Sequence, residues 1–154
     1  VMLFLSWRFG KDGFKFWLLT IAVIVLGDQL GALLKYLLAQ PRPCAELGEV
    51  VRQTDTLFSI NCSRHLNGMP SNHALNFFLF VTFSSYVLRW RGWVLGFGLL
   101  AILVALSRVY LGVHYPSQIL AGTFIGVSVG AGAGWLSMRH LSFVQRVKRL
   151  AEKS

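Results

Sequence analysis

The chain contains four long stretches of apolar residues, each separated from the next by a shorter polar segment. A helix that crosses a bilayer needs about 20 mostly apolar residues, and four stretches approach or exceed that length. They are residues 16–38, 73–88, 93–110 and 115–138. Residues 1–7 are apolar but too short to span, and they look like the end of a helix whose start is missing or like a packed amphipathic stub. The pattern predicts about four full spans plus an N-terminal helix stub.

The composition supports a membrane protein and excludes two other classes. Apolar residues make up 55% of the 154 residues and charged ones only 14%, against roughly 25% charged in a soluble domain. The mean hydropathy is +0.57. So much apolar surface excludes a soluble globule and a disordered chain. We therefore expect an all-α, polytopic membrane bundle in which residues 1–154 form one domain.

The basic residues predict how the bundle is oriented. Ten of the 15 fall on one side of the predicted spans: Arg8, Lys11, Lys15, Arg89, Arg91, Arg139, Arg146, Lys148, Arg149 and Lys153. Because basic residues gather on the cytoplasmic side of membranes, we place both ends of the sequence there. The loop of residues 41–69 and the turn of residues 111–114 then face outside.

The net charge of +9 would suggest nucleic acid in a soluble chain, but in so apolar a chain it favours membrane lipids and their phosphates, and no nucleic-acid partner is expected. The stretch from Arg139 is basic and amphipathic, with Leu141, Val144, Val147 and Leu150 at helical spacing. We expect this stretch to lie along anionic lipid headgroups.

Small residues and cysteines give two further expectations. The fourth stretch carries glycines at 122, 126, 130, 132 and 134, a spacing that lets helices approach closely in lipid, and packing within the chain is favoured over dimerisation. Cys44 and Cys62 both fall in the predicted outer loop. In an oxidising compartment they would form one disulfide, and two free thiols are the alternative.

Several charged residues lie within or at the ends of the apolar stretches, where charge is costly. Lys35 and Arg108 sit toward the outer ends of their spans, and Asp28 lies two helical turns before Lys35. Singly, they could be snorkelling cations and a buried ion pair. Together with His73 and His114, which share the outer face, they indicate a functional site.

Read in order, the outer face carries three clusters: Lys35-x6-Arg42-Pro43, Pro70-Ser71-Asn72-His73 and Ser107-Arg108-x5-His114. Guanidinium groups and the start of a helix both bind phosphate. Ser71 is a good N-cap residue, so an ordinary cap is the alternative for the second cluster alone. Jointly, the clusters predict an oxyanion site.

These clusters resemble the signature of the type-2 phosphatidic acid phosphatase superfamily, which is related to bacterial acid phosphatases and vanadium haloperoxidases. The family pattern reads Lys-x6-Arg-Pro, Pro-Ser-Gly-His and Ser-Arg-x5-His-x3-Asp. The resemblance covers about residues 28–122 and is closest over residues 107–117. Two positions depart from the pattern: Asn72 replaces glycine, and Gln118 replaces aspartate.

The resemblance implies that a phosphomonoester or diphosphate is hydrolysed through a phosphohistidine, without metal or cofactor. His114 would be the nucleophile, and His73 the general acid that protonates the leaving oxygen. The phosphate oxygens would be held by Lys35, Arg42 and Arg108, with hydrogen bonds from Ser71 and the Asn72 amide. Phosphate, vanadate and tungstate would inhibit.

Gln118 stands where the family residue orients the nucleophile. Its amide oxygen can still accept the imidazole N–H of His114, but it carries no charge to stabilise an imidazolium. The comparable Asp→Asn change in a serine-protease triad lowers kcat about 10⁴-fold. We therefore expect a slow enzyme unless Asp28 takes over the role, and a substitution made to trap a complex is another explanation of Gln118.

Two functions follow from the resemblance. The first is an integral lipid phosphatase, acting on a substrate such as undecaprenyl diphosphate, phosphatidate or phosphatidylglycerol phosphate at the outer face of a bacterial plasma membrane. The second is a catalytically silent membrane protein that binds lipid phosphate. A soluble haloperoxidase is disfavoured because the apolar stretches have membrane length.

Overall fold

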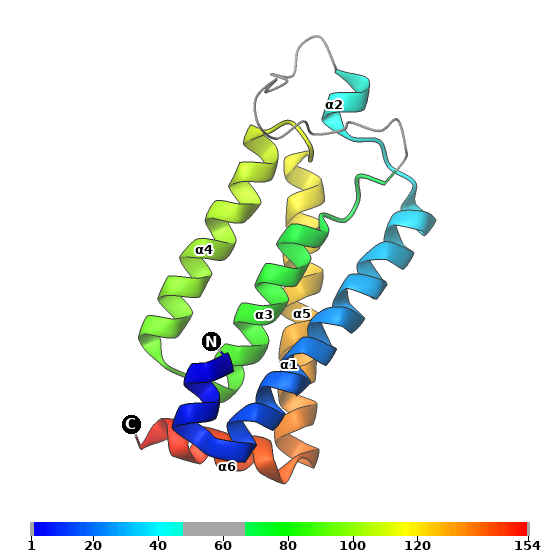
Figure 1. Cartoon of the computed structure of the whole chain (residues 1–154). Helices are drawn as coiled ribbons and strands as arrows, with labels where there is room; N and C mark the ends of the chain where they lie inside the picture. The colour runs from blue at the N-terminus through cyan, green and yellow to red at the C-terminus, as the bar shows by residue number, and fades with distance from the viewer. Residues whose placement is uncertain (1, 48–66, 154) are drawn as a thin grey trace.

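A computed structural model describes residues 2–47 and 67–153, and all the regular structure within them is helical. The helices are α1 (Met2–Leu38), α2 (Pro43–Glu46), α3 (Asn72–Leu88), α4 (Arg91–Tyr110), α5 (Pro116–His140) and α6 (Ser142–Glu152). Figure 1 shows α1, α3, α4 and α5 running side by side, with α2 at one end and α6 lying across the other. We call the α2 end the outer end and the α6 end the base. The predicted all-α membrane bundle is confirmed.

Within the described residues, three helical segments are long and apolar enough to cross a membrane: Ser6–Glu46, Arg91–Tyr110 and Pro116–His140. The second predicted span is α3, whose 17 residues extend about 26 Å, slightly less than the hydrocarbon core. The expectation of four full spans is corrected to three and a shorter central helix. Leu75, Leu79 and Phe83 of α3 are fully buried, because this helix packs against its neighbours along its whole length.

The outward faces of the other long helices are apolar. Leu26 of α1, Leu95 of α4 and Phe124 of α5 are each about 70% exposed. Contiguous apolar surface of this extent is unfavourable in water and is typical of helices that face lipid. The outer surface therefore agrees with the hydropathy of the sequence.

The predicted N-terminal stub is part of α1 and is separated from the long remainder by Gly10. Gly10 has φ 57° and ψ −140°, a backbone conformation that glycine adopts without the steric cost other residues incur. The chain consequently turns at the base before α1 rises through the bundle (Figure 1). Phe9, just before the turn, is buried and stacks on Trp90 at a centroid distance of 5.9 Å, so the end of the stub packs against the bundle.

Glycines bring α5 into direct contact with the backbone of α3. A Cβ atom added at Gly122 would lie 2.5 Å from the carbonyl oxygen of Ser71, and one at Gly126 would overlap the carbonyl oxygen of Leu75. Gly132 has open space around the same position. The predicted packing of the small-residue stripe within the chain is thus confirmed for the face that contains Gly126.

The amphipathic stretch after Arg139 forms α6, whose apolar face packs against the base rather than against lipid. Val144 and Val147 are fully buried in the cluster that contains Phe16 and Val87. Leu150 remains 46% exposed. The apolar face of this stretch is therefore covered by the ends of α1 and α3, and contact of its basic face with headgroups stays a prediction.

Candidate active site

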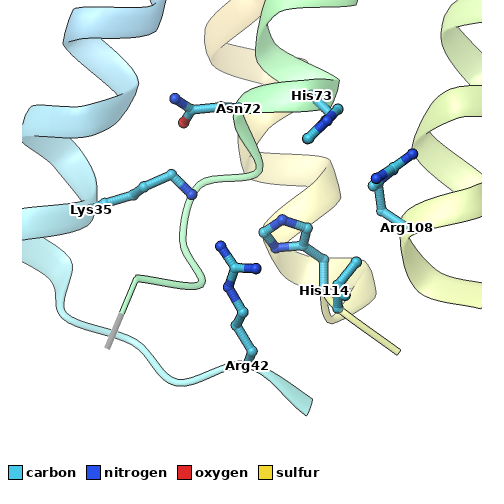
Figure 2. A pocket seen from close by; sticks show the side chains of 7 residues that line it. Lys35, Arg42, Asn72, His73, Arg108 and His114 are labelled. Carbon is cyan, nitrogen blue, oxygen red and sulfur yellow. The ribbon is translucent and has the colours of Figure 1, made fainter. Parts of the chain in front are cut away.

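A pocket of about 240 Å³ opens at the outer end between α1, α3, α4 and the turn before α5 (Figure 2). Val113 supplies one apolar wall, and every other lining residue was predicted from the sequence motifs. The lining consists of Lys35, Arg42, Asn72, His73, Arg108, Val113 and His114. Side chains from four separate parts of the chain thus share one cavity.

Lys35 and Arg42 are both held by a residue that the sequence motifs do not contain. The Lys35 ammonium group donates to the backbone oxygen of Asn67 at 3.0 Å, and Arg42 Nε donates to the side-chain oxygen of Asn67 at 3.0 Å. Asn67 therefore sets two cations side by side. A polar residue in a polar loop carries no sequence signal of such a role, which explains why it was missed.

Arg42 lies in a short segment with little conformational freedom, Pro41-Arg42-Pro43, which we call the arginine segment. Each proline ring fixes its own φ and restricts the residue before it. The backbone N–H of Cys44 donates to the backbone oxygen of Gly112 at 3.1 Å, which fastens α2 beside the turn that carries His114.

Cys44 forms a disulfide. Its expected partner, Cys62, lies outside the described residues, so that pairing stays a prediction.

Ser71 occupies the N-cap position of α3 without making the predicted capping hydrogen bond. Its hydroxyl oxygen is buried and has no hydrogen-bond partner in the described part of the chain, and Ser71 does not line the pocket. The backbone N–H of Ser71 donates instead to the backbone oxygen of Gln118 at 3.1 Å. The start of α3 is consequently fixed by α5 rather than by its own cap.

Asp28 interacts with the first turns of α3. One of its carboxylate oxygens accepts hydrogen bonds from the side-chain amides of Asn72 and Asn76, each at 2.9 Å. Asn72, which replaces the family glycine, therefore ties α3 to α1 at the edge of the pocket. Within residues 2–47 and 67–153 the structure gives Asp28 no hydrogen bond to His114, so it does not supply the orienting carboxylate considered above.

His73 and Arg108 face the pocket from α3 and α4 (Figure 2). The Nε atom of Arg108 is buried and has no hydrogen-bond acceptor among the described residues. A buried charged donor without an acceptor is costly, and an oxyanion in the pocket would supply one. The His114 ring lies between Arg42 and His73 in this view.

Gln118 fixes the protonation of His114. The backbone N–H of Tyr115 donates to Gln118 Oε1 at 3.2 Å, and Gln118 Nε2 donates to the carbonyl oxygen of Pro41 at 2.8 Å. A backbone N–H only donates and a carbonyl only accepts, so these two contacts fix which way the amide points. His114 Nδ1, 3.0 Å from Oε1, must therefore carry a proton, which leaves the lone pair of Nε2 available as a nucleophile.

His114 is only 4% exposed, and its pKa is lowered from the usual value to about 4, chiefly by this burial. The positive charges of Lys35 and Arg42 contribute in the same direction, whereas the hydrogen bonds to Gln118 and the backbone of Gly68 oppose the shift. His114 is consequently neutral at pH 7, which is the state a nucleophilic imidazole requires.

The pocket thus combines three cationic side chains with two imidazoles, and the described residues that line it include no carboxylate. Such a set can bind a tetrahedral oxyanion and deliver an imidazole nitrogen to its central atom. Within the described ranges there is no group of three or more His, Cys, Asp or Glu side chains arranged to hold a metal ion.

Residues 15–141 match the PAP2 superfamily. The chain is 28% identical over 133 residues to the bacitracin transport permease protein BcrC of Bacillus licheniformis, covering 86% of this chain and 61% of that protein. It is 29% identical over 151 residues to glucose-6-phosphatase catalytic subunit 1 of Canis lupus familiaris, covering 83% and 41%. It is 31% identical over 125 residues to lipid phosphate phosphatase gamma of Arabidopsis thaliana, covering 73% and 50%.

The chain therefore spans about half the length of these relatives. No solved structure matches it significantly. The family match covers most of the sequence and includes every residue that lines the pocket. The expected resemblance is confirmed: the chain belongs to the PAP2 superfamily.

Proposed function

We propose that this chain is an integral membrane phosphatase that removes phosphate from a lipid monophosphate or diphosphate at the outer end of the bundle. The observation that carries the proposal is the pocket in which three cations surround the neutral His114 imidazole. Three cations in one cavity repel one another unless an anion neutralises them, and phosphate is an anion that guanidinium groups bind bidentately.

In the proposed first step, His114 Nε2 attacks the phosphorus atom and the bond from phosphorus to the ester or diphosphate oxygen breaks. His73 donates a proton to that leaving oxygen as general acid. The product is a phosphohistidine on His114, whose ring now carries a positive charge. Gln118 Oε1 accepts the hydrogen bond from the Nδ1–H group throughout and holds the ring in line for the attack.

In the second step, water attacks the phosphohistidine and His73, now neutral, takes the proton of that water. Phosphate leaves and both histidines return to their starting states. The three cationic residues Lys35, Arg42 and Arg108 hold the non-bridging oxygens in both steps, where the developing charge is spread over those oxygens. The Asn72 backbone N–H is proposed to add a hydrogen bond from the start of α3, whereas the buried Ser71 hydroxyl, which does not line the pocket, is not assigned one.

A lipid substrate is favoured by where the pocket lies. It opens at the ends of helices whose outward faces are apolar, so a phosphate at the membrane surface would reach it while its hydrocarbon tail stays in the bilayer. One relative is named as a lipid phosphate phosphatase and another as a glucose-6-phosphatase. The experiment described next distinguishes a lipid substrate from a soluble sugar phosphate. Basic residues gather at the α6 end of the bundle, and basic residues favour the cytoplasmic side of a membrane. This supports a proposal in which the outer end faces the outside of a bacterial plasma membrane.

The deciding experiment measures phosphate released by the purified protein from undecaprenyl diphosphate, phosphatidate and phosphatidylglycerol phosphate, with glucose 6-phosphate as the soluble comparison. Release from one of the lipids, inhibited by vanadate and tungstate, is expected. Release from glucose 6-phosphate alone would contradict the lipid assignment.

The second candidate is a silent lipid-phosphate-binding protein, and the observation that favours it is the uncharged Gln118 beside His114. Binding of the lipids without phosphate release in a single turnover would establish this alternative. Quenching the same reaction with alkaline detergent, in which the N–P bond of a phosphohistidine survives, distinguishes the two, because only the enzyme forms a 32P-labelled protein that His114→Ala abolishes.

A further inference from the structure

Gln118 makes one contact that the orienting role does not require. The hydrogen bond from His114 uses only the amide oxygen of Gln118. The amide nitrogen donates to the carbonyl oxygen of Pro41 at 2.8 Å. An aspartate, the family residue, has no such donor at neutral pH. Gln118 is only 1% exposed and the contact is partly buried, so water competes little with this hydrogen bond and its loss is costly.

The Pro41 carbonyl and the backbone nitrogen of Arg42 belong to one planar peptide unit. Since the rings of Pro41 and Pro43 remove most of the remaining backbone freedom, holding that carbonyl also sets the position from which the Arg42 side chain starts. Gly68 lies directly over the contact, because a Cβ added there would be 2.5 Å from both Gln118 Nε2 and the Pro41 oxygen. The contact is thus enclosed by backbone.

We propose that Gln118 is a positioning residue with two ends, which couples the nucleophile His114 to the phosphate-binding Arg42 through the Pro41 carbonyl. One end fixes the His114 tautomer and the other fixes the arginine segment relative to it. The glutamine is then an adaptation of this chain rather than a weakened aspartate. The inference rests on the proposed function in one respect only, that the pocket binds phosphate.

Gln118→Glu tests the coupling because it preserves the length of the side chain and the acceptor for His114 and replaces only the donor to Pro41. We expect the KM for the lipid phosphate and the Kd of orthovanadate to rise about tenfold, the scale of one buried hydrogen bond. The kcat should not fall, since a carboxylate favours the imidazolium formed on attack. A general loss of structure would lower kcat as well.

A new negative charge near the pocket would also weaken anion binding, and a double-mutant cycle with Arg42→Gln separates the two causes. If Gln118 acts through Arg42, Gln118→Glu raises the vanadate Kd less than about threefold in the Arg42→Gln background. An equal effect in both backgrounds would show a charge effect alone and overturn the coupling, as would no effect in either.

Tyr115→Phe is the matched control. The Tyr115 hydroxyl donates to the Glu46 carboxylate at 2.7 Å. Like the Gln118 contact it joins the start of α5 to the segment that follows α1, but it does so at the surface and without touching Pro41. Its vanadate Kd should stay within about twofold of the unmodified chain, and a tenfold rise would contradict the specific role of Gln118. If the unmodified chain neither binds vanadate nor releases phosphate, the proposed function and the coupling are both overturned. If it binds vanadate but the effects of Gln118→Glu and Arg42→Gln on the Kd are additive, only the coupling is overturned.

Discussion

The two ends of the bundle are built on opposite principles. At the outer end the buried residues Ser71, His114 and Gln118 are polar, and hydrogen bonds hold the side chains of His114 and Gln118. At the base most buried side chains are apolar, as with Val147 of α6 and Phe83 of α3, which belong to one cluster. The difference teaches that hydrophobic packing at the base stabilises the fold, while the outer end keeps groups whose value lies in their chemistry.

The largest difference between activity and stability is expected when the nucleophile is removed. His114→Ala should lower kcat at least about 10³-fold, because no other imidazole is placed to form the covalent intermediate. The thermal midpoint should not fall, since the outer end contributes chemistry rather than packing. Phosphate release and thermal unfolding in detergent measure the two effects. A parallel loss of stability would show that the outer end is structurally essential.

The interface of α3 and α5 belongs to both ends, and Gly126→Ala tests it. The added Cβ would overlap the backbone oxygen of Leu75, which cannot rotate away, so we expect a loss of about 1–3 kcal/mol, as for an overpacked core. Gly132→Ala is the matched control because its Cβ meets open space. Unfolding of the two variants in the same detergent decides the question, and equal midpoints would contradict the close packing.

A substitution at the base should have the reverse signature of His114→Ala. Val147→Ala removes two buried methyl groups and should cost about 2 kcal/mol of unfolding free energy, while kcat/KM stays within about twofold. Leu150→Ala, on the same helix but 46% exposed, should cost much less. If Val147→Ala lowers kcat/KM tenfold, the base and the pocket are coupled through the helices and the contrast drawn above fails.

Much of the outer end could be predicted from the sequence because regular helices carry it. The spacing of Lys35, His73 and Arg108 relative to the ends of the apolar stretches is enough to bring them to one face once the helices pack. The function of such positions depends on helix periodicity and span length, which are local properties of the sequence. The pocket accordingly contains the predicted residues.

The remaining features depend on contacts between segments that are distant in the sequence. Asn67 and the Pro41 carbonyl take part through loops whose backbone path has no periodic signal. Ser71 has the residue type of a cap, yet α5 rather than its own hydroxyl satisfies the start of α3. The amphipathic pattern of α6 gives the direction of an apolar face but not whether lipid or protein covers it, and Val144 is covered by protein.

Acidification provides a subtler distinction between the ends. Because burial lowers the pKa of His114 to about 4, the unfolded chain binds its proton at higher pH than the folded chain does. Stability from this group is fully present above about pH 6.5 and is lost as the pH falls toward 4. The thermal midpoint should therefore decline across that window, less steeply in His114→Asn and unchanged in slope in Val147→Ala. Equal slopes in all three would place the titrating group elsewhere.

The smallest effect is expected from the ion pair that joins α6 to α1. Arg146 Nε and Nη2 contact the two carboxylate oxygens of Asp12 at 2.6 and 2.9 Å, a favourable geometry, but the pair is solvent-exposed and such pairs add little to stability. Arg146→Ala should lower the thermal midpoint less than Val147→Ala, and the difference should shrink as salt is added. A larger loss than that of Val147→Ala would mean that charge, not apolar packing, holds α6 in place, and the base would then resemble the outer end in its construction.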